Sequence, residues 1–369
     1  MKSIKSDCRH FRGDRPCGPH KLKGVHCGSC FDYEPSEQRV LIIKLGAIGD
    51  VLRTTPLLVP LRQSNPRALI TWLTETPEIL PASHVDRILD ATPGNLEWLR
   101  AARFDWIINL DKDPMAIGLT ETLEAVRKTG FGMDEWGRCR PLDDTASRRK
   151  WLTGLWDDVN RANRKHYMEE IFEMCGYSFK GEPYILKDTL TEPSWPLDSN
   201  RPKAGLNTGC GGRWKSRLWP EEYWSELAGM LMEDGYQVVL LGGAEEHEKN
   251  RRIANRSGAD YFGVFDLKTF IHLVNGIDLM VTAVTMAMHV AIGLGKRLVL
   301  FNNIFNPHEF YLYDRGVILS PEMECGCYYA SECPKRCMET LRVETARRAV
   351  HTLLPLPGVP AGGGKTSKQ

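Results

Sequence analysis

The stretch RVLIIKLGAIGD, residues 39–50, decides the fold class. Its apolar run from Val40 to Ile43 is continuous, as in a parallel strand that is buried on both faces of a sheet. Gly46 and Gly49 follow in a turn, and an apolar segment at helical spacing comes next. This strand–turn–helix unit predicts an α/β domain with a parallel sheet.

Similar apolar runs recur along the chain. They lie at 69–73 and 106–110, and then at 203–207, 237–241, 278–282 and 297–301. The segments between them are long enough for helices, which predicts right-handed crossovers and parallel sheets. A length of 369 residues favours two globular halves.

The predicted organisation has four parts. A Cys-rich segment at 1–37 precedes an N-terminal Rossmann-like domain at 38–190 and a C-terminal one at 203–355. A Pro-containing linker lies around 191–202. The Pro- and Gly-rich tail at 356–369 has the composition of a disordered end.

Composition excludes several classes of protein. The chain has 48 basic and 47 acidic residues, a net charge of +1, so no global field attracts nucleic acid. No apolar stretch reaches the roughly 18–20 residues that span a bilayer. The first residues lack the apolar core of a secretory signal. We expect a cytoplasmic protein with no transmembrane segment and no nucleic-acid partner.

Eight of the eleven cysteines form two clusters, one near each end. The first comprises Cys8, Cys17, Cys27 and Cys30, and its closing CGSC has the spacing of a zinc knuckle. We predict a structural zinc ion there; His10, His20 or His26 could replace one ligand, and free thiols are the alternative. The second, CGCYYASECPKRC, comprises Cys325, Cys327, Cys333 and Cys337, and suits zinc or an iron–sulfur cluster. Both clusters are interpreted as structural or docking elements rather than catalytic ones.

The turn at 44–56 carries the candidate catalytic base. Asp50 follows Gly46 and Gly49 directly after a strand, at the edge where open α/β sheets bind ligands. A carboxylate there can accept a proton from a substrate. The alternative is that Asp50 only caps a helix. The glycine spacing differs from that of the dinucleotide fingerprint.

A second loop predicts an anion site. After the strand at 203–207 come Thr208, Gly209, Gly211 and Gly212, and then the cations Arg213, Lys215 and Arg217 ahead of a helix that opens at Pro220. Backbone N–H groups and cations on one loop suit a diphosphate, although loop charges are often merely solvated. Glu245 or Glu246, just beyond the strand at 237–241, would bind ribose hydroxyls or belong to the first turn of a helix. His289, beside an apolar helix, is more typical of a packed core residue.

Four motifs, taken in order, resemble the ADP-heptose:lipopolysaccharide heptosyltransferase family. They are KLGAIGDVLRTTP at 44–56, GCGGRWKSRLWP at 209–220, LLGGAEE at 240–246 and MHVAIGLGK at 288–296. The resemblance implies a GT-B fold, in which two Rossmann-like domains face each other across a cleft. It also implies inverting transfer of heptose from ADP-heptose to a lipopolysaccharide core or a related lipid-linked acceptor, with no catalytic metal.

The resemblance assigns roles to individual residues. Asp50 would deprotonate the acceptor hydroxyl, Lys215 would neutralise the departing nucleoside diphosphate, and Glu245 would hold the ribose. The donor site would also include Thr208, the glycine loop, Arg217, Thr285 and His289. The acceptor side would include Gly46, Gly49 and, as a contact for acceptor phosphates, Arg62. We expect the lipid-linked acceptor to be met at the inner face of the cytoplasmic membrane, through peripheral contact.

One segment departs from the family pattern. The family usually has the three-residue motif Asp-Thr/Ser-Gly before the Met-His pair. This chain has Val284-Thr285-Met286 at that place. A transferase of the same fold that uses another nucleotide sugar is therefore one alternative. A non-catalytic metal-binding or redox module on a transferase scaffold is the other. The acceptor, the linkage, the metal and the oligomeric state stay open.

Overall fold

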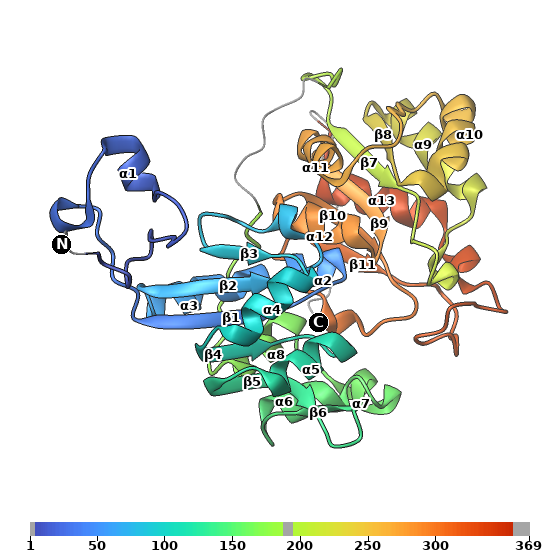
Figure 1. Cartoon of the computed structure of the whole chain (residues 1–369). Helices are drawn as coiled ribbons and strands as arrows, with labels where there is room; N and C mark the ends of the chain where they lie inside the picture. The colour runs from blue at the N-terminus through green and yellow to red at the C-terminus, as the bar shows by residue number, and fades with distance from the viewer. Residues whose placement is uncertain (1–3, 187–194, 357–369) are drawn as a thin grey trace. The chain divides into compact units, whose positions relative to one another are not determined.

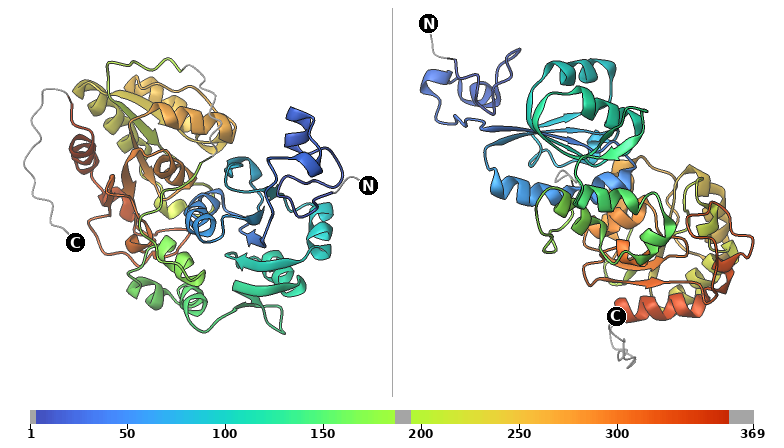
Figure 2. Two further views of the ribbon diagram at one scale, coloured as in Figure 1. Left: turned by 90° about the vertical axis from the view of Figure 1, so that its left-hand side faces the viewer. Right: turned by 90° about the horizontal axis from the view of Figure 1, so that it is seen from below.

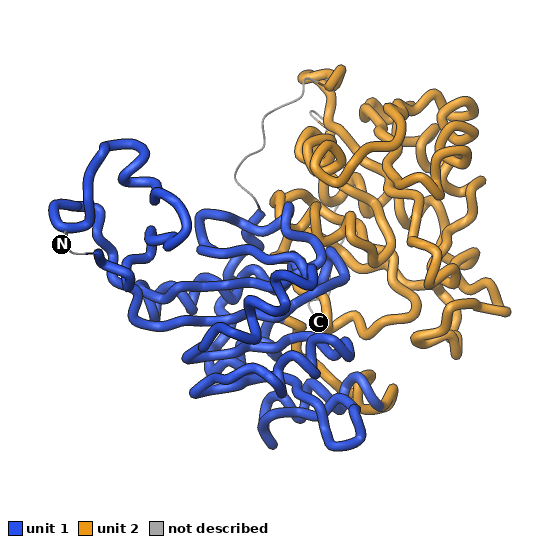
Figure 3. The backbone as a smooth tube through the Cα atoms, in the orientation of Figure 1, with its two compact units in different colours: residues 1–155, 168–188 blue, residues 156–167, 189–369 orange. Residues whose placement is uncertain are grey.

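The computed structural model describes residues 4–186 and 195–356. The chain forms two compact units (Figure 3): residues 1–155 and 168–188 make the first, and residues 156–167 and 189–369 make the second. The short segment 156–167 thus groups with the C-terminal unit, although it lies inside the predicted domain 38–190. Most of the predicted tail and part of the predicted linker lie outside the described residues.

The sheet of the first unit has the strand order β3-β2-β1-β4-β5-β6 (Figure 1). Its strands are β1 (Gln38–Ile43), β2 (Ala68–Leu73), β3 (Arg87–Leu89), β4 (Phe104–Asn109), β5 (Ala125–Met133) and β6 (Cys139–Pro141). All neighbours pair in parallel except β5 and β6. This order is that of the Rossmann fold, in which ligands bind outside the carboxyl ends of the strands where the order reverses. Here the reversal lies between β1 and β4.

Helices cover both faces of this sheet (Figure 2). On one face, Leu41 and Ile43 of β1 pack in a buried cluster with Leu99 and Leu119, which come from α4 (Pro93–Ala101) and α5 (Pro114–Thr122). Besides a short helix in the Cys-rich segment, the other described helices of the unit are α2 (Ile48–Leu52), α3 (Leu58–Ser64), α6 (Ala146–Leu152) and α8 (Tyr167–Met174). The apolar run from Val40 to Ile43 is completely buried, as its composition predicts.

The sheet of the second unit is parallel throughout, with the order β11-β10-β9-β7-β8. Its strands are β7 (Lys203–Asn207), β8 (Gln237–Leu241), β9 (Leu279–Ala283), β10 (Arg297–Phe301) and β11 (Gly316–Leu319). This is the other common doubly wound order, with its reversal between β7 and β9. The prediction of two α/β domains with parallel sheets is confirmed.

One face of this second sheet carries most of the core. Leu206 and Val281 pack with Trp224, Leu227 and Val350, which belong to α9 (Glu221–Asp234) and α13 (Val343–Leu353). The remaining helices are α7 (Asp157–Ala162), α10 (His247–Ser257), α11 (Leu267–Gly276) and α12 (Met286–Gly293). Among all the helices described, none is long and apolar enough to cross a membrane.

The Cys-rich N-terminal segment is joined to the amino edge of the first sheet. It contains α1 (Gly18–Lys23) and a 3₁₀ turn at Cys27–Ser29. Arg9 donates its backbone N–H to Glu34 O over 2.7 Å and forms an ion pair with Asp86, the residue before β3. Since the strands are parallel, this attachment lies at the edge opposite to the Gly46 turn.

Candidate functional site

Asp50 lies in the first turn of α2, immediately beyond the carboxyl end of β1. The N-cap of this helix is Ala47, so Asp50 occupies the third helical position and does not cap the helix as the alternative reading supposed. Its Oδ1 accepts from Arg53 Nη2 over 2.7 Å, and 34 % of its side chain is exposed. The carboxylate is thus both accessible and paired with a cation.

A second carboxylate, Asp111, supports the turn that presents Asp50. It follows β4, the neighbour of β1 across the reversal point. Its Oδ2 accepts from Leu45 N over 3.1 Å and from Lys44 Nζ over 3.2 Å. Sequence reasoning missed Asp111, although the polar run DKD directly after the strand at 106–110 is a usable signal.

Lys112 was missed as well. Burial, together with the nearby Lys150 charge, lowers the pKa of the Lys112 ammonium to about 8. Its Nζ lies 4.9 Å from the centre of the Phe131 ring and donates to Lys150 O over 3.3 Å. A partly buried cation with a lowered pKa therefore stands beside the same sheet edge as Asp50.

The glycine loop after β7 passes close to the carboxylates at the start of α10. A Cβ on Gly209 would lie 2.3 Å from the Glu246 carboxyl group, and one on Gly212 would lie 3.3 Å from Glu245 Oε1. Gly211 has a φ of +69°, which also favours glycine. Thr208 is buried, and its hydroxyl donates to Asn250 Oδ1 over 2.6 Å, so its side chain holds the loop.

The two adjacent glutamates have different surroundings. Glu246 Oε2 accepts from Gly243 N over 2.9 Å, which occupies that carboxylate at the entrance to the helix. Over the described part of the chain, no hydrogen bond to the Glu245 carboxylate is formed. Glu245 is therefore the one whose carboxylate is available for a ribose.

The cations of this loop also divide into two kinds. Lys215 opens a 3₁₀ turn, Lys215–Arg217, is exposed, and lines a cavity of about 380 Å³ together with Cys333 and Arg336. Arg217 is buried, donates to Cys210 O and lies over the Phe305 ring. Burial lowers the pKa of Arg217. These contacts make Arg217 a support of the loop rather than a free ligand for the donor.

Thr285 and His289 lie at the β7–β9 reversal point. Thr285 is the N-cap of α12, and its Oγ1 is 3.2 Å from Thr282 Oγ1 and 3.4 Å from Asn207 Nδ2. His289 is buried within α12. The structure thus brings the first turn of α12 to the same edge as the glycine loop.

Arg62 has a structural role that differs from the predicted acceptor contact. Its guanidinium donates to Ala68 O over 2.6 Å, to His84 O over 2.7 Å and to Asp86 Oδ2 over 2.6 Å. These partners lie at the amino ends of β2 and β3, at the edge opposite to Asp50. The acceptor-binding prediction for Arg62 is corrected accordingly.

The four C-terminal cysteines form a compact candidate metal centre. Their Sγ atoms all lie within 4.8 Å of one another. Cys325 and Cys333 are 3.3 Å apart, and Cys327 and Cys337 are 3.6 Å apart. Tetrahedral ligation by thiolates at about 2.3 Å places sulfur atoms about 3.8 Å from one another, so the four residues fit a single ion.

The thiols of this centre differ in their surroundings: burial raises the pKa values of Cys327 and Cys337, whereas that of Cys333 is lowered. Burial opposes ionisation of Cys333, but the N–H of Cys337, 3.5 Å from its Sγ, and the neighbouring thiols lower the pKa of Cys333 to about 7. A thiolate is the form that binds metal. An iron–sulfur cluster would spread the four thiolates over two or four irons and hold some or all of the sulfur atoms farther apart, so the geometry favours one ion.

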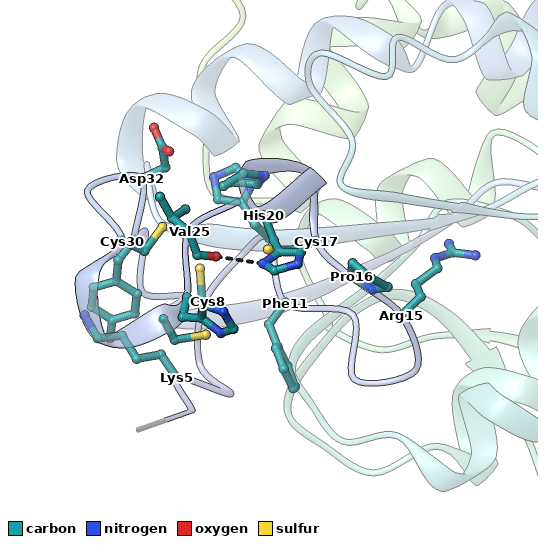
Figure 4. A pocket seen from close by; sticks show the side chains of 15 residues that line it. Lys5, Cys8, Phe11, Arg15, Pro16, Cys17, His20, Val25, Cys30 and Asp32 are labelled. Atoms are coloured by element: carbon teal, nitrogen blue, oxygen red, sulfur yellow. Dashed lines mark hydrogen bonds between the residues drawn. The ribbon is translucent and has the colours of Figure 1, made fainter. Parts of the chain in front are cut away.

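The N-terminal cysteines line one pocket (Figure 4). Its volume is about 230 Å³, and it is lined by Cys8, Cys17, Cys27 and Cys30 and also by His10, His20 and His26. His20 Nδ1 lies 2.9 Å from Val25 O. Among the His, Cys, Asp and Glu residues that the structure describes, the C-terminal set is the one whose ligand atoms converge on a single point.

Comparisons with known proteins place these features in context. The family model for glycosyltransferase family 9 (heptosyltransferase) matches residues 96–313. Lipopolysaccharide heptosyltransferase 1 of Escherichia coli K12 is 26% identical over 293 residues, which cover 70% of this chain and 85% of that protein.

Two solved structures are similar in fold. E. coli heptosyltransferase WaaC with ADP superimposes with a TM-score of 0.61 at 20% identity, over 85% of this chain and 97% of WaaC. The iron-containing dodecameric glycosyltransferase TibC of enterotoxigenic E. coli gives a TM-score of 0.54 at 15% identity, over 86% of this chain and 78% of TibC.

Proposed function

Since the chain belongs to glycosyltransferase family 9, the heptosyltransferases, we propose that it transfers heptose from ADP-heptose to a lipopolysaccharide core or a related lipid-linked acceptor, with inversion at the anomeric carbon. The observation that carries the proposal is the placement of Asp50, accessible and not engaged as a helix cap, at the binding edge of a Rossmann sheet. The proposal takes heptose and lipopolysaccharide from the names of the similar proteins, and it takes ADP from the ligand of the WaaC structure.

Asp50 acts as the general base in the proposed reaction. Its carboxylate accepts the proton of the acceptor hydroxyl, and the oxygen attacks the anomeric carbon from the face opposite to the diphosphate. The new glycosidic bond forms as the bond from the anomeric carbon to the diphosphate oxygen breaks, which inverts the configuration. Arg53 Nη2 lies 2.7 Å from Asp50 Oδ1, so the two side chains form an ion pair.

The departing diphosphate is stabilised by the second unit. The N–H groups of the Gly209–Gly212 loop and the Lys215 ammonium offset its charge, and the first turn of α12 adds further N–H donors. Glu245 binds the ribose hydroxyls. Fixed donors of this kind stabilise a leaving group without a catalytic metal.

Both cysteine clusters are proposed to bind metal for structural reasons. The C-terminal centre takes one zinc or iron ion through Cys325, Cys327, Cys333 and Cys337. TibC, a glycosyltransferase of similar fold, is described as iron-containing, which supports iron as one candidate. In this proposal neither metal contacts a reacting atom.

Another nucleotide sugar is the competing proposal for the donor. Thr285 keeps its place at the start of α12, but Val284 and Met286 stand where an acid and a glycine are expected. Met286 adds bulk beside the diphosphate and Val284 removes a charge, and either change alters which sugar fits.

Product formation on heptose-deficient lipopolysaccharide, followed by mass spectrometry, tests the proposal with ADP-heptose and a panel of other nucleotide sugars. We expect transfer from one donor and a loss of about 10²- to 10⁴-fold in Asp50→Asn, the usual contribution of a general base. Asp144→Asn, at an exposed position, is the control. If no donor binds and none reacts, the alternative of a non-catalytic metal-binding module replaces this function.

A further inference from the structure

The C-terminal cysteine loop, residues 325–337, holds the turn that carries Lys215. Ser216, which is buried, donates its backbone N–H to Ser331 O over 2.8 Å and its hydroxyl to Ala330 O over 2.6 Å. Both acceptors lie between Cys327 and Cys333. The residue after Lys215 is therefore fixed to this loop through main chain and side chain.

Asn303 links the same turn to the sulfur atoms. Its Nδ2 donates to Ser216 O over 2.8 Å and lies 3.4 Å from Cys337 Sγ and 3.9 Å from Cys327 Sγ. Its Oδ1 is buried with no hydrogen-bond partner in the described structure. Turning the amide over would set Oδ1 against the Ser216 carbonyl, so the N–H groups must face Ser216 and the thiolates.

The residue before Lys215 packs on the same loop. The Trp214 ring lies 6.3 Å from the Tyr329 ring and 6.1 Å from the Phe305 ring, with both pairs edge to face. Trp214 packs against a buried cluster that includes Cys327 and Cys337. Lys215 and Cys333 also line one cavity.

We propose that the metal bound by the C-terminal cysteines positions Lys215 for the donor diphosphate, with Ser216 and Asn303 as the connecting residues. The loop around the cysteines has little regular structure besides the short turn at Cys337–Thr340. Metal–thiolate bonds supply the folding energy of such loops. Removing the metal frees the loop, and with it both residues that flank Lys215. The inference rests on the proposed role of Lys215 in diphosphate binding.

The test measures ADP affinity by calorimetry alongside metal content by elemental analysis. We expect chelated protein and Cys333→Ser to bind ADP about tenfold more weakly than metal-loaded protein. Asn303→Leu, which keeps all four ligands, should lose affinity while retaining metal. Cys139→Ser, outside the cluster, is the control.

Lys215→Ala provides the decisive comparison. If the metal acts through Lys215, removing the metal from the Lys215→Ala variant leaves its ADP affinity unchanged. The loss of affinity from metal removal and the loss from the substitution are then not additive. Equal ADP affinity with and without metal in the wild type would overturn the inference but not the transferase function. Absence of ADP binding in every form would instead overturn the proposed function.

A different observation concerns the N-terminal pocket. All four cysteines of the first cluster line it, yet within the described chain their ligand atoms do not converge as those of the C-terminal set do. The cavity of about 230 Å³ far exceeds the space that one ion needs, since even a water molecule occupies only about 30 Å³ of liquid volume. Its wall carries two cations, Lys5 and Arg15, and one carboxylate, Asp32.

We infer that this pocket holds a multinuclear iron–sulfur cluster rather than the single zinc ion that the knuckle spacing predicts. Four thiolates arranged around a cavity are the ligand set of such clusters. At the amino edge of the sheet, opposite to Asp50, the cluster has no part in sugar transfer.

Anaerobic purification tests this assignment on the full chain. We expect acid-labile sulfide together with an equal amount of iron, in addition to any single ion that the C-terminal cysteines hold, and a visible charge-transfer band. Cys27→Ser should lose the sulfide and the part of the band that accompanies it, whereas Cys333→Ser should keep the sulfide. Colourless wild-type protein with zinc and no sulfide would refute the cluster, and this readout does not depend on the folding of any variant.

Discussion

Glu245 and Glu246 are neighbours in sequence with separate tasks. Glu246 accepts from Gly243 N, whereas the Glu245 carboxylate lies beside Gly212. If Glu245 binds ribose, Glu245→Ala should raise the Kd of ADP about tenfold, because hydrogen bonds to a charged group contribute about 1.5–3 kcal/mol.

Inorganic pyrophosphate is the control ligand for this change. Its affinity should be the same in Glu245→Ala and in the wild type, since it has no ribose. A parallel loss for both ligands, seen by titration calorimetry, would show that Glu245 acts on the loop and not on the sugar.

Lys112 makes stability depend on pH in a defined direction. Its pKa, about 8 when folded, lies below the ordinary value of 10.5, so between these two pH values the unfolded chain binds more protons. The free energy of unfolding therefore rises with pH over this window, by up to about 3 kcal/mol. Lys112→Met should lack this rise, as measured by urea unfolding at several pH values. If the free energy of unfolding changes with pH in the same way in Lys112→Met and in the wild type, the Lys112 ammonium is not desolvated.

Sequence alone predicts Asp50 and the glycine loop because each directly follows a buried apolar run. It does not reveal Asp111, whose role depends on β4 lying beside β1 in the sheet, a fact of strand order. For the same reason Arg62 is misread: a cation in a polar stretch resembles an anion contact until its three acceptors at the amino edge are known.

At the scale of elements, the β7 loop approaches α10 too closely for any side chain at Gly209. Gly209→Ala places a Cβ against the Glu246 carboxyl group, which its bond to Gly243 holds in place. We expect a loss of about 1–3 kcal/mol in the free energy of unfolding, the usual range for overpacking, and weaker ADP binding.

Gly229→Ala in α9 is the matched substitution. No atom lies within 4 Å of the added Cβ there, so this variant should be more stable than the wild type by about 0.5–1 kcal/mol. Thermal melts of the two variants should therefore shift in opposite directions. Shifts of the same sign would mean that the packing around Gly209 is looser than described.

The elements themselves are largely predictable from sequence. The apolar runs at 203–207, 237–241 and 297–301 coincide with β7, β8 and β10, because buried parallel strands lack polar alternation. The order of the strands within each sheet is not visible in the runs. Neither is the grouping of 156–167, which depends on contacts with residues far along the chain.

At the scale of the whole molecule, Asn306 holds that segment in place. Its buried Nδ2 donates to Asn160 O over 2.6 Å and to Asn163 O over 2.8 Å. Asn306→Ala should reduce the free energy of unfolding by about 1–3 kcal/mol, since it leaves two carbonyl groups without their donor. Asn200→Ala, at an exposed position, should have no measurable effect in the same chemical unfolding experiment.

The placement of residues 156–167 has a consequence for synthesis on the ribosome. Asn160 and Asn163 leave the exit tunnel 146 and 143 residues before Asn306, their partner. The N-terminal unit cannot be completed as an uninterrupted stretch, because the chain leaves it after residue 155 and returns at residue 168. Residues 156–167 cannot contact the rest of the C-terminal unit until that unit has been translated. Fragments that end near residue 190 would therefore contain this segment without Asn306, which donates hydrogen bonds to it in the full chain.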